Sequence, residues 1–279
     1  MEESSVRGGE VASVGDFVHP GSFRLHSRFT RVVNFSAADH LISLVDEEVG
    51  GGPSHIVLKN IDLGKAGETL NVTFSEVETG EIRLSLPDNS FRSSVSGRAV
   101  TREAVREVWS RVRKNVLLQA SCRSAVFALE DRSSSSSDGA FESAMRERIR
   151  AGVECLRSGE WLEGARLLRG VGFGLTPTGD DLLAGFLTGL NLVDAPRDRI
   201  EEIYAAALGE NAISNSQLFF GKEGRLFEGT RRLLSAVERC MAGEIPGAVT
   251  LLLSRGSTSG ADFSVGLILA VEPSLKGEE

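Results

Sequence analysis

The hydrophobic positions follow different periods in the two parts of the chain. Residues 81–86, Glu-Ile-Arg-Leu-Ser-Leu, alternate strictly between polar and apolar, which is typical of a half-buried β-strand. After Gly97 the apolar residues recur at the three- and four-residue spacing of a helix face. The pattern predicts an α+β fold in which a β-rich barrel or sandwich (residues 1–98) precedes a mainly α-helical domain (residues 99–279).

Individual elements follow from the same periods and from the Gly, Pro and Asn punctuation between them. The expected strands are 10–18, 23–35, 41–45, 54–59, 71–74 and 81–86. The expected helices are 104–129, 141–156, 160–168, 180–193, 199–208, 225–241 and 261–271. The serine run at 133–139 predicts a flexible loop between the first two helices.

Composition narrows the class of protein. A chain that is 41% hydrophobic and 25% charged is globular, and the net charge of −8 argues against nucleic acid as a partner. No apolar run approaches the ~20 residues of a membrane span, and the polar start Met1-Glu2-Glu3 is unlike a secretory signal. We therefore expect a cytoplasmic protein that does not enter a membrane. Its three cysteines are expected to be reduced thiols in or near the core.

The most informative segment lies in the helical part. Gly170-x-Gly172-x-Gly174 is followed by Leu-Thr-Pro-Thr-Gly-Asp-Asp at 175–181 and then by an apolar run to Gly185. Near the C-terminus, residues 258–266 repeat the order hydroxyl, Gly, any residue, Asp, apolar, two of any type, Gly. We call residues 170–185 and 258–266 the first and second Gly-Asp motifs. A repeat of this kind marks a repeated structural unit, and both copies are expected at helix N-termini.

A helix N-terminus has unpaired backbone N–H groups and a partial positive charge, which favour a bound anion. In this interpretation the anion contacts come from both motifs and from the arginine just before the second. They are Gly172, Gly174, Thr176, Thr178, Gly179, Thr258, Ser259, Gly260 and Arg255. Neither a P-loop nor a dinucleotide fingerprint fits, because Asp180 and Asp181 stand where a P-loop has Lys and Ser/Thr.

The motif acids bring negative charge to the same place as the expected anion. Asp180, Asp181 and Asp262 are the candidate catalytic residues. Mg²⁺ resolves the conflict, since it is commonly held by one or two carboxylates and substrate phosphates; Asp181 and Asp262 are its expected ligands. The alternative is that these acids only compensate the helix dipole and cap the turns.

The two helices that follow the motifs are apolar enough for a core. The first carries Gly185 and Gly189 on a small-residue side that another helix can approach closely. We predict that the two helices pack together, with both N-termini at one shared pocket. Asp181 and Asp262 then approach each other, and the two carboxylates either bind a cation or raise the pKa of one of them.

Together the two motifs resemble a prokaryotic family of unknown function that includes the third subunit of oxamate carbamoyltransferase, an enzyme of allantoin degradation and purine catabolism. The resemblance extends over most of the chain, but only the two motifs are specific. Ser257 departs from the family, whose members often carry histidine there. The resemblance implies a role beside acyl- or carbamoyl-phosphate chemistry and, with it, partner subunits or a homo-oligomer.

Three functions remain open at this point. The first is a subunit of a carbamoyltransferase-like complex that binds a small phosphate or carboxylate at paired helix N-termini, with Mg²⁺. The second is a stand-alone, metal-assisted enzyme acting on a small phosphorylated or carboxylated metabolite. The third is a non-catalytic structural or regulatory protein.

Overall fold

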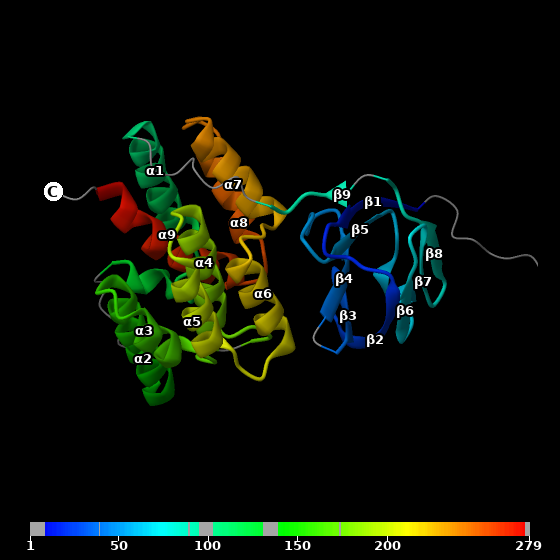
Figure 1. Cartoon of the computed structure of the whole chain (residues 1–279), viewed down its shortest axis with the longest axis horizontal. Helices are drawn as coiled ribbons and strands as arrows, with labels where there is room; N and C mark the ends of the chain where they lie inside the picture. Colours follow the sequence, from blue (N-terminus) through cyan, green and yellow to red (C-terminus); the bar gives the residue numbers. More distant parts are fainter. Residues whose placement is uncertain are drawn as a thin grey trace, which may run out of the picture. The chain divides into compact units, whose positions relative to one another are not determined.

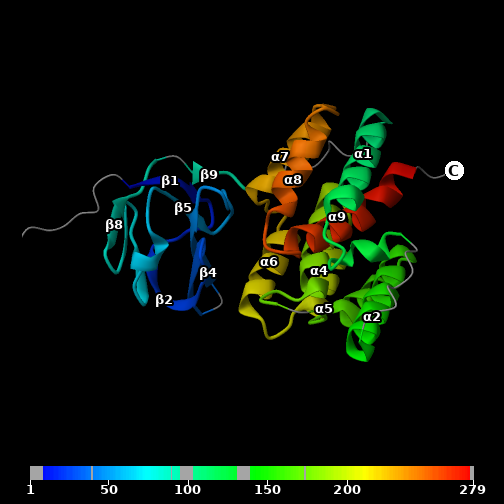
Figure 2. The same ribbon diagram turned by 180° about the vertical axis from the view of Figure 1, so that it is seen from behind.

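The computed structural model describes residues 9–38, 40–88, 90–94, 103–130, 139–172 and 174–276. The chain forms two compact units, which are described separately. The β unit is Met1–Ser94 with Leu226–Glu228, and the helical unit is Val95–Arg225 with Gly229–Glu279. Strands occupy the first and helices the second (Figures 1 and 2). The predicted α+β fold is confirmed, whereas the predicted boundary at residue 98 lies outside the described residues.

The β unit contains one curled sheet. Its strands are β1 (Glu10–Gly15), β2 (Gly21–Arg28), β3 (Val32–Ala37), β4 (His40–Asp46), β5 (His55–Lys59), β6 (Thr69–Val72), β7 (Glu76–Thr79), β8 (Ile82–Ser85) and β9 (Ser90–Phe91), with the short 3-10 helix η1 (Leu63–Lys65). Across the sheet their order is β8-β7-β6-β2-β3-β4-β5-β1-β9. In the described residues the strands form a single sheet.

The middle strands carry the core of this unit. β4 is buried at five consecutive positions, a continuous apolar run that a central strand needs. Its one polar member, Ser43, donates a hydrogen bond to Asn34 of β3 (2.7 Å), and Asn34 donates to Ser27 (3.0 Å). The predicted strand 23–35 is in fact two strands, β2 and β3, which pair antiparallel across a short turn.

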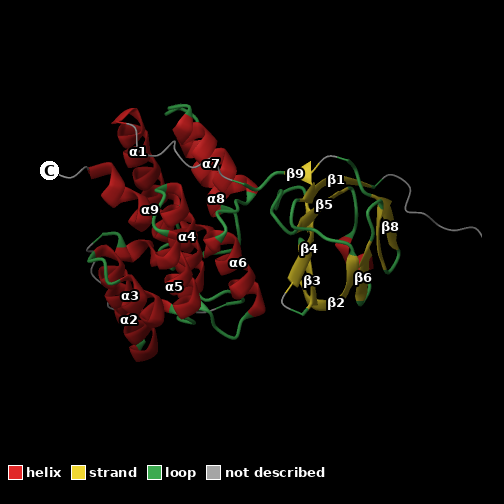
Figure 3. Cartoon of the chain, in the orientation of Figure 1, coloured by secondary structure: helices red, strands yellow, loops and turns green. Residues whose placement is uncertain are grey.

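The helical unit is built from α1 (Glu103–Gln119), the 3-10 helix η3 (Ala125–Ala128), α2 (Ala140–Arg157), α3 (Trp161–Leu168), α4 (Thr178–Leu192), α5 (Arg197–Ala207), α6 (Ala212–Lys222), α7 (Glu228–Glu238), α8 (Ile245–Leu253) and α9 (Ser259–Lys276). Figure 3 shows that helices and loops make up the described part of this unit. The expected loop at 133–139 falls largely outside the described residues.

Several helices differ from the prediction. The helix expected over 104–129 ends at Gln119, because Ser121 and Ser124 form a polar turn in which the Ser124 hydroxyl donates to the Ser121 carbonyl (2.6 Å). α6 and α8 were not predicted. α6 begins at an N-cap, Asn211, whose side chain accepts hydrogen bonds from the backbone N–H groups of Ile213 and Ser214 (both 3.0 Å).

α4 is the central helix of this unit. Nearly all of its side chains are buried, and it packs against α9, α6, α5 and α3, which are labelled with it in Figure 1. A helix that is apolar all round belongs in such a place. The first Gly-Asp motif therefore lies at the start of the most enclosed helix.

The cysteines are free thiols, as predicted, but their expected location is wrong for two of them. Cys122 and Cys240 are exposed and Cys155 is half-buried. Cys122 lies in the polar turn after α1, and Cys240 follows α7 with a positive φ of 53°. These positions are turns, where sequence periodicity does not report burial.

Candidate functional site

α4 and α9 cross in direct backbone contact. A Cβ atom on Gly185 of α4 would collide with the carbonyl oxygen of Phe263 of α9. Conversely, a Cβ atom on Gly266 would collide with the carbonyl oxygen of Leu182. Each partner is 81 residues from its counterpart, which is also the spacing of the two motifs. The crossing is therefore an approximate two-fold arrangement, and the predicted close packing of the two motif helices is confirmed.

The glycine that precedes each motif acid also has a packing role. Gly179 lies against the carbonyl oxygen of Leu168, the last residue of α3, and Gly260 lies against that of Leu252 in α8. In both places a helix start rests on the end of the helix before it, without room for a side chain. The pairs α3–α4 and α8–α9 are thus similar structural units, and each contains one Gly-Asp motif.

The two helix starts meet through hydroxyl groups. The hydroxyls of Thr176 and Ser259 lie 3.1 Å apart, and Thr176 donates a hydrogen bond to the Asp181 carboxylate (2.8 Å). Ser259, from the second motif, also stabilises ionised Asp181 of the first, while Thr178 of the first motif stabilises ionised Asp262 of the second. The hydroxyl of each motif therefore faces the acid of the other.

Asp262 is completely buried. One of its oxygens accepts a hydrogen bond from the backbone N–H of Ala125 at the start of η3 (2.6 Å). Its other oxygen, Oδ2, has no hydrogen-bond partner among the described residues. Thr178 and Thr258 lie near enough to lower the pKa of Asp262 but do not meet the geometry of a hydrogen bond to it.

Burial dominates the electrostatics of both acids. It raises the pKa of Asp181 from 3.8 to about 6, although the Arg255 guanidinium and the Ser259 and Thr176 hydroxyls oppose the rise. It raises the pKa of Asp262 to about 7, where the Ala125 N–H opposes the rise and the charge of Asp181 adds to it. The charge of Asp181 thus acts on Asp262, and the pKa values of both acids lie close to neutral pH.

Arg255 is the cation of this site. It is half-buried, and its guanidinium lies 6.0 Å from the ring centre of Phe263. Burial lowers the pKa of Arg255, and the attraction of Asp181 opposes the change. An anion that binds here competes with Asp181 for the guanidinium.

Asp180 forms a different hydrogen bond from those of Asp181 and Asp262. Its carboxylate accepts a hydrogen bond from the backbone N–H of Gly170 (2.7 Å). Burial raises its pKa, and the Gly170 N–H, the Ser214 hydroxyl and the charge of Arg169 oppose the rise. Asp180 therefore closes the turn between α3 and α4, and its catalytic role stays a prediction.

The glycines before α4 have distinct surroundings. Gly172 has a φ of 133°, and a Cβ atom there would collide with Thr178. Gly174 has a φ of 100° and nothing within 4 Å of its Cβ position, so its side faces open space. Positive φ at both positions favours glycine. Pro177 occupies the N-cap position of α4, and no side chain caps this helix start.

No group of three or more His, Cys, Asp or Glu side chains that could hold a metal occurs within the described ranges. Asp181 and Asp262 form a pair, so a magnesium ion here needs further oxygens from a ligand or from hydroxyl groups. The magnesium site and a shared pocket stay predictions.

One contact could not be found from the motifs. Ala125 N–H approaches Asp262 from 137 positions away in the chain, and a backbone donor has no sequence signature. The glycines of the helix crossing did have a signal, because Gly185 and Gly266 repeat at the same place in the two motifs.

We compared the chain with known protein families to test the resemblance carried by the two motifs. Residues 168–271 match the family of the oxamate carbamoyltransferase subunit AllH. The match begins at the end of α3 and ends within α9, so it contains both Gly-Asp motifs and the whole helix crossing. The match is to the family that the motifs resemble, and it covers less than half of the chain. The AllH match leaves the strands of the β unit outside it.

No curated protein and no solved structure matches the chain. In the described part of the chain, no helix combines the length and the apolar character that crossing a membrane requires.

Proposed function

We propose that this chain is a subunit of a carbamoyltransferase-like complex and binds a small phosphate or carboxylate where α4 and α9 begin. The observation that carries the proposal is the reciprocal contact of the two motifs, in which the Thr176 and Ser259 hydroxyls meet beside Asp181. Two helix N-termini, hydroxyl donors and the Arg255 guanidinium supply the positive and hydrogen-bonding groups that an anion needs.

The ligand must also tolerate Asp181 and Asp262. A magnesium ion between the ligand and these carboxylates removes the repulsion, and it supplies Lewis-acid stabilisation of a phosphate or carbonyl oxygen when bound. The unpaired Oδ2 of Asp262 and the raised pKa of both acids fit a cation, because burial of the two carboxyl groups is only partly compensated by the Arg255 guanidinium and the nearby hydrogen-bond donors. In the chain itself, Asp181 and Asp262 hold this ion and Arg255 orients the anion.

We further propose that the protein acts in the cytoplasm, with partner subunits or other copies of itself. The match to a family of enzyme subunits favours this over the stand-alone enzyme. The structural alternative has its own support, since Asp181 and Asp262 each accept a hydrogen bond from within the chain. In that case the motifs only fasten α4 to α9.

Isothermal titration of the full chain with carbamoyl phosphate, phosphate or oxamate, with and without Mg²⁺, tests the proposal. Binding that weakens about tenfold or more in Arg255→Ala supports it, because a charge-assisted contact is lost. Arg239→Ala is the matched control, since that arginine lies on the surface and pairs with Glu244 (3.0 Å). Failure of all three anions to bind the wild-type chain, or equal losses in both variants, refutes the anion site.

A further inference from the structure

A cavity lies between α3 and α5, and its lining contains no residue of the Gly-Asp motifs. It encloses about 520 Å³, within the range of small-molecule sites. We call it the α3–α5 cleft and define it by Trp161, Leu162, Glu163, Glu160, Ile203 and Arg199, with Gly159, Arg166 and Glu202 completing the lining. Its walls belong to the helical unit alone.

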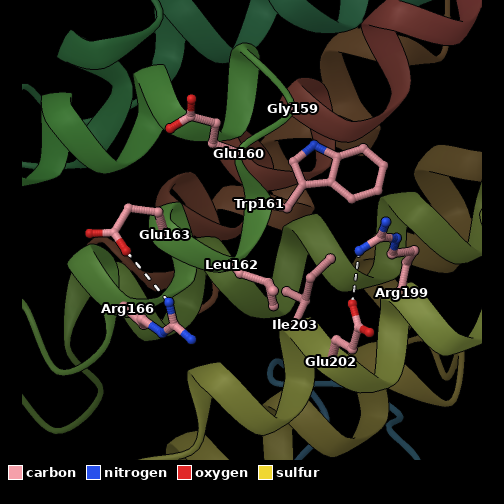
Figure 4. Close-up of a pocket in the computed structure, with 9 residues that line it drawn as sticks. All are labelled: Gly159, Glu160, Trp161, Leu162, Glu163, Arg166, Arg199, Glu202 and Ile203. Carbon is pink, nitrogen blue, oxygen red and sulfur yellow. Dashed lines mark hydrogen bonds and ion pairs between the residues drawn. The ribbon is translucent and has the colours of Figure 1, made fainter.

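The base of the α3–α5 cleft is apolar. Figure 4 shows Leu162 and Ile203 side by side in the centre, with Trp161 beside them. The Trp161 ring is half-buried and meets Phe186 edge to face, with ring centres 5.9 Å apart and an interplanar angle of 73°. This contact fixes the indole, which then offers a rigid aromatic wall to a ligand.

The charges around the cleft do not cancel. Arg166 pairs with Glu163 (3.6 Å) and Arg199 pairs with Glu202 (3.0 Å), each within its own helix. Glu160 forms no ion pair or side-chain hydrogen bond within the described part of the chain. In Figure 4 the Glu160 and Glu163 carboxylates lie on one side of the apolar centre, and Trp161 and Arg199 lie on the other.

The pKa of the Cys155 thiol, in the last turns of α2, is affected by the same glutamates. Burial raises the pKa of this thiol, and the charges of Glu160, Glu163 and Glu154 raise it further. The acidic side of the cleft therefore favours a positive group.

We propose that the α3–α5 cleft binds a small organic cation, in which an ammonium or guanidinium faces Glu160 and an apolar body lies on Leu162, Ile203 and Trp161. An anion fits less well, because both arginines of the cleft already have carboxylate partners. This site and its ligand class are independent of the anion site at α4 and α9.

Benzylammonium is a suitable probe because it joins one ammonium to one aromatic ring. The chain contains two tryptophans, so its indole N–H groups give two NMR signals, and Trp161→Phe assigns them. We expect the Trp161 signal to shift saturably with benzylammonium while the signal of buried Trp109 stays in place. Benzoate and benzyl alcohol have the same ring without the positive charge and are expected to cause little shift.

Glu160→Gln removes the charge and keeps the shape. Its side chain makes no cap hydrogen bond to α3, so the fold is expected to persist, and benzylammonium is expected to bind about fivefold more weakly. Glu147→Gln, an exposed glutamate of α2 outside the cleft, is the matched control and is expected to bind as the wild type does. The proposal is overturned if benzylammonium causes no shift up to about 10 mM, if benzoate binds equally well, or if the two glutamate variants behave alike.

Discussion

Replacing Asp262 with asparagine is expected to stabilise the helical unit above neutral pH. The folded pKa of Asp262 is about 7 and its ordinary value is 3.8. Each tenfold change in an ionisation constant corresponds to about 1.4 kcal/mol, so ionising this buried carboxyl costs about 4 kcal/mol of folding free energy. Asparagine stays neutral, keeps an oxygen for the Ala125 N–H and places an amide near the hydroxyls of Thr178 and Thr258.

The raised pKa of Asp262 determines whether the substitution stabilises or destabilises the fold at each pH. Because the pKa is higher in the folded state, the folded chain holds a proton between about pH 4 and pH 7 that the unfolded chain releases. The contribution of Asp262 to the free energy of unfolding is fully present below about pH 4, decreases as the pH rises and is lost above about pH 7. Asp262→Asn should therefore gain up to about 4 kcal/mol near pH 8 and little near pH 4.

Urea unfolding followed by tryptophan emission measures this difference, because Trp109 and Trp161 both lie in the helical unit. EDTA should be present, so that no bound metal stabilises the wild-type carboxylate. Asp198→Asn, on an exposed position of α5, is the control and should change stability by less than about 0.5 kcal/mol. A loss of stability in Asp262→Asn near pH 8, or a gain that does not depend on pH, would refute the assignment of a buried, uncompensated charge.

Three further predictions concern the packing around the motifs. Gly266→Ala should lower the free energy of unfolding by about 3 kcal/mol, because the new Cβ atom collides with the Leu182 carbonyl. The control Gly247→Ala in α8 has open space around the new Cβ atom and should raise the free energy of unfolding by up to about 1 kcal/mol. Urea unfolding compares the two variants, and equal effects contradict the helix crossing. Asn191→Leu should lower the free energy of unfolding by about 2 to 3 kcal/mol in the same assay, because the Asn191 amide donates hydrogen bonds to the carbonyls of Leu187, Gly221 and Lys222 (3.1, 2.8 and 3.0 Å). An unchanged unfolding midpoint would show that these hydrogen bonds are not made. Thr176→Val should raise the pKa of Asp181 above about 6 by removing the hydroxyl that donates to it; carboxyl carbon NMR titration checks this, and a lowered pKa contradicts it.

The sequence was most informative where one chemical requirement acts on one position. The small-residue side of the first motif helix, with Gly185 and Gly189, predicted the close approach of another helix, and Gly185 does lie against the backbone of Phe263, where only glycine fits. The alternation in 81–86 predicted a strand, and β8 lies within it. The charge and position of Arg255 indicated a residue that acts at the motif, and its attraction to Asp181 shows that it is near.

Other features depend on contacts between distant residues and have no local pattern. The helix expected from residue 225 begins at Glu228 instead, because Leu226–Glu228 belongs to the β unit, where the Glu228 carboxylate accepts from the Gly51 N–H (2.8 Å). α6 was missed because its N-terminal half is polar and its start depends on Asn211. The burial of Asp262 was likewise invisible, since it results from η3 closing over the second motif.

The helix crossing also determines how α4 and α9 can move. Flexible side chains usually separate two helices and let them slide past each other, but here each backbone lies against the other at Gly185 and Gly266. The starts of both helices are additionally joined by the Thr176 and Ser259 hydroxyls. We therefore expect α4 and α9 to move together as one rigid body, so that a displacement of one motif also displaces the other.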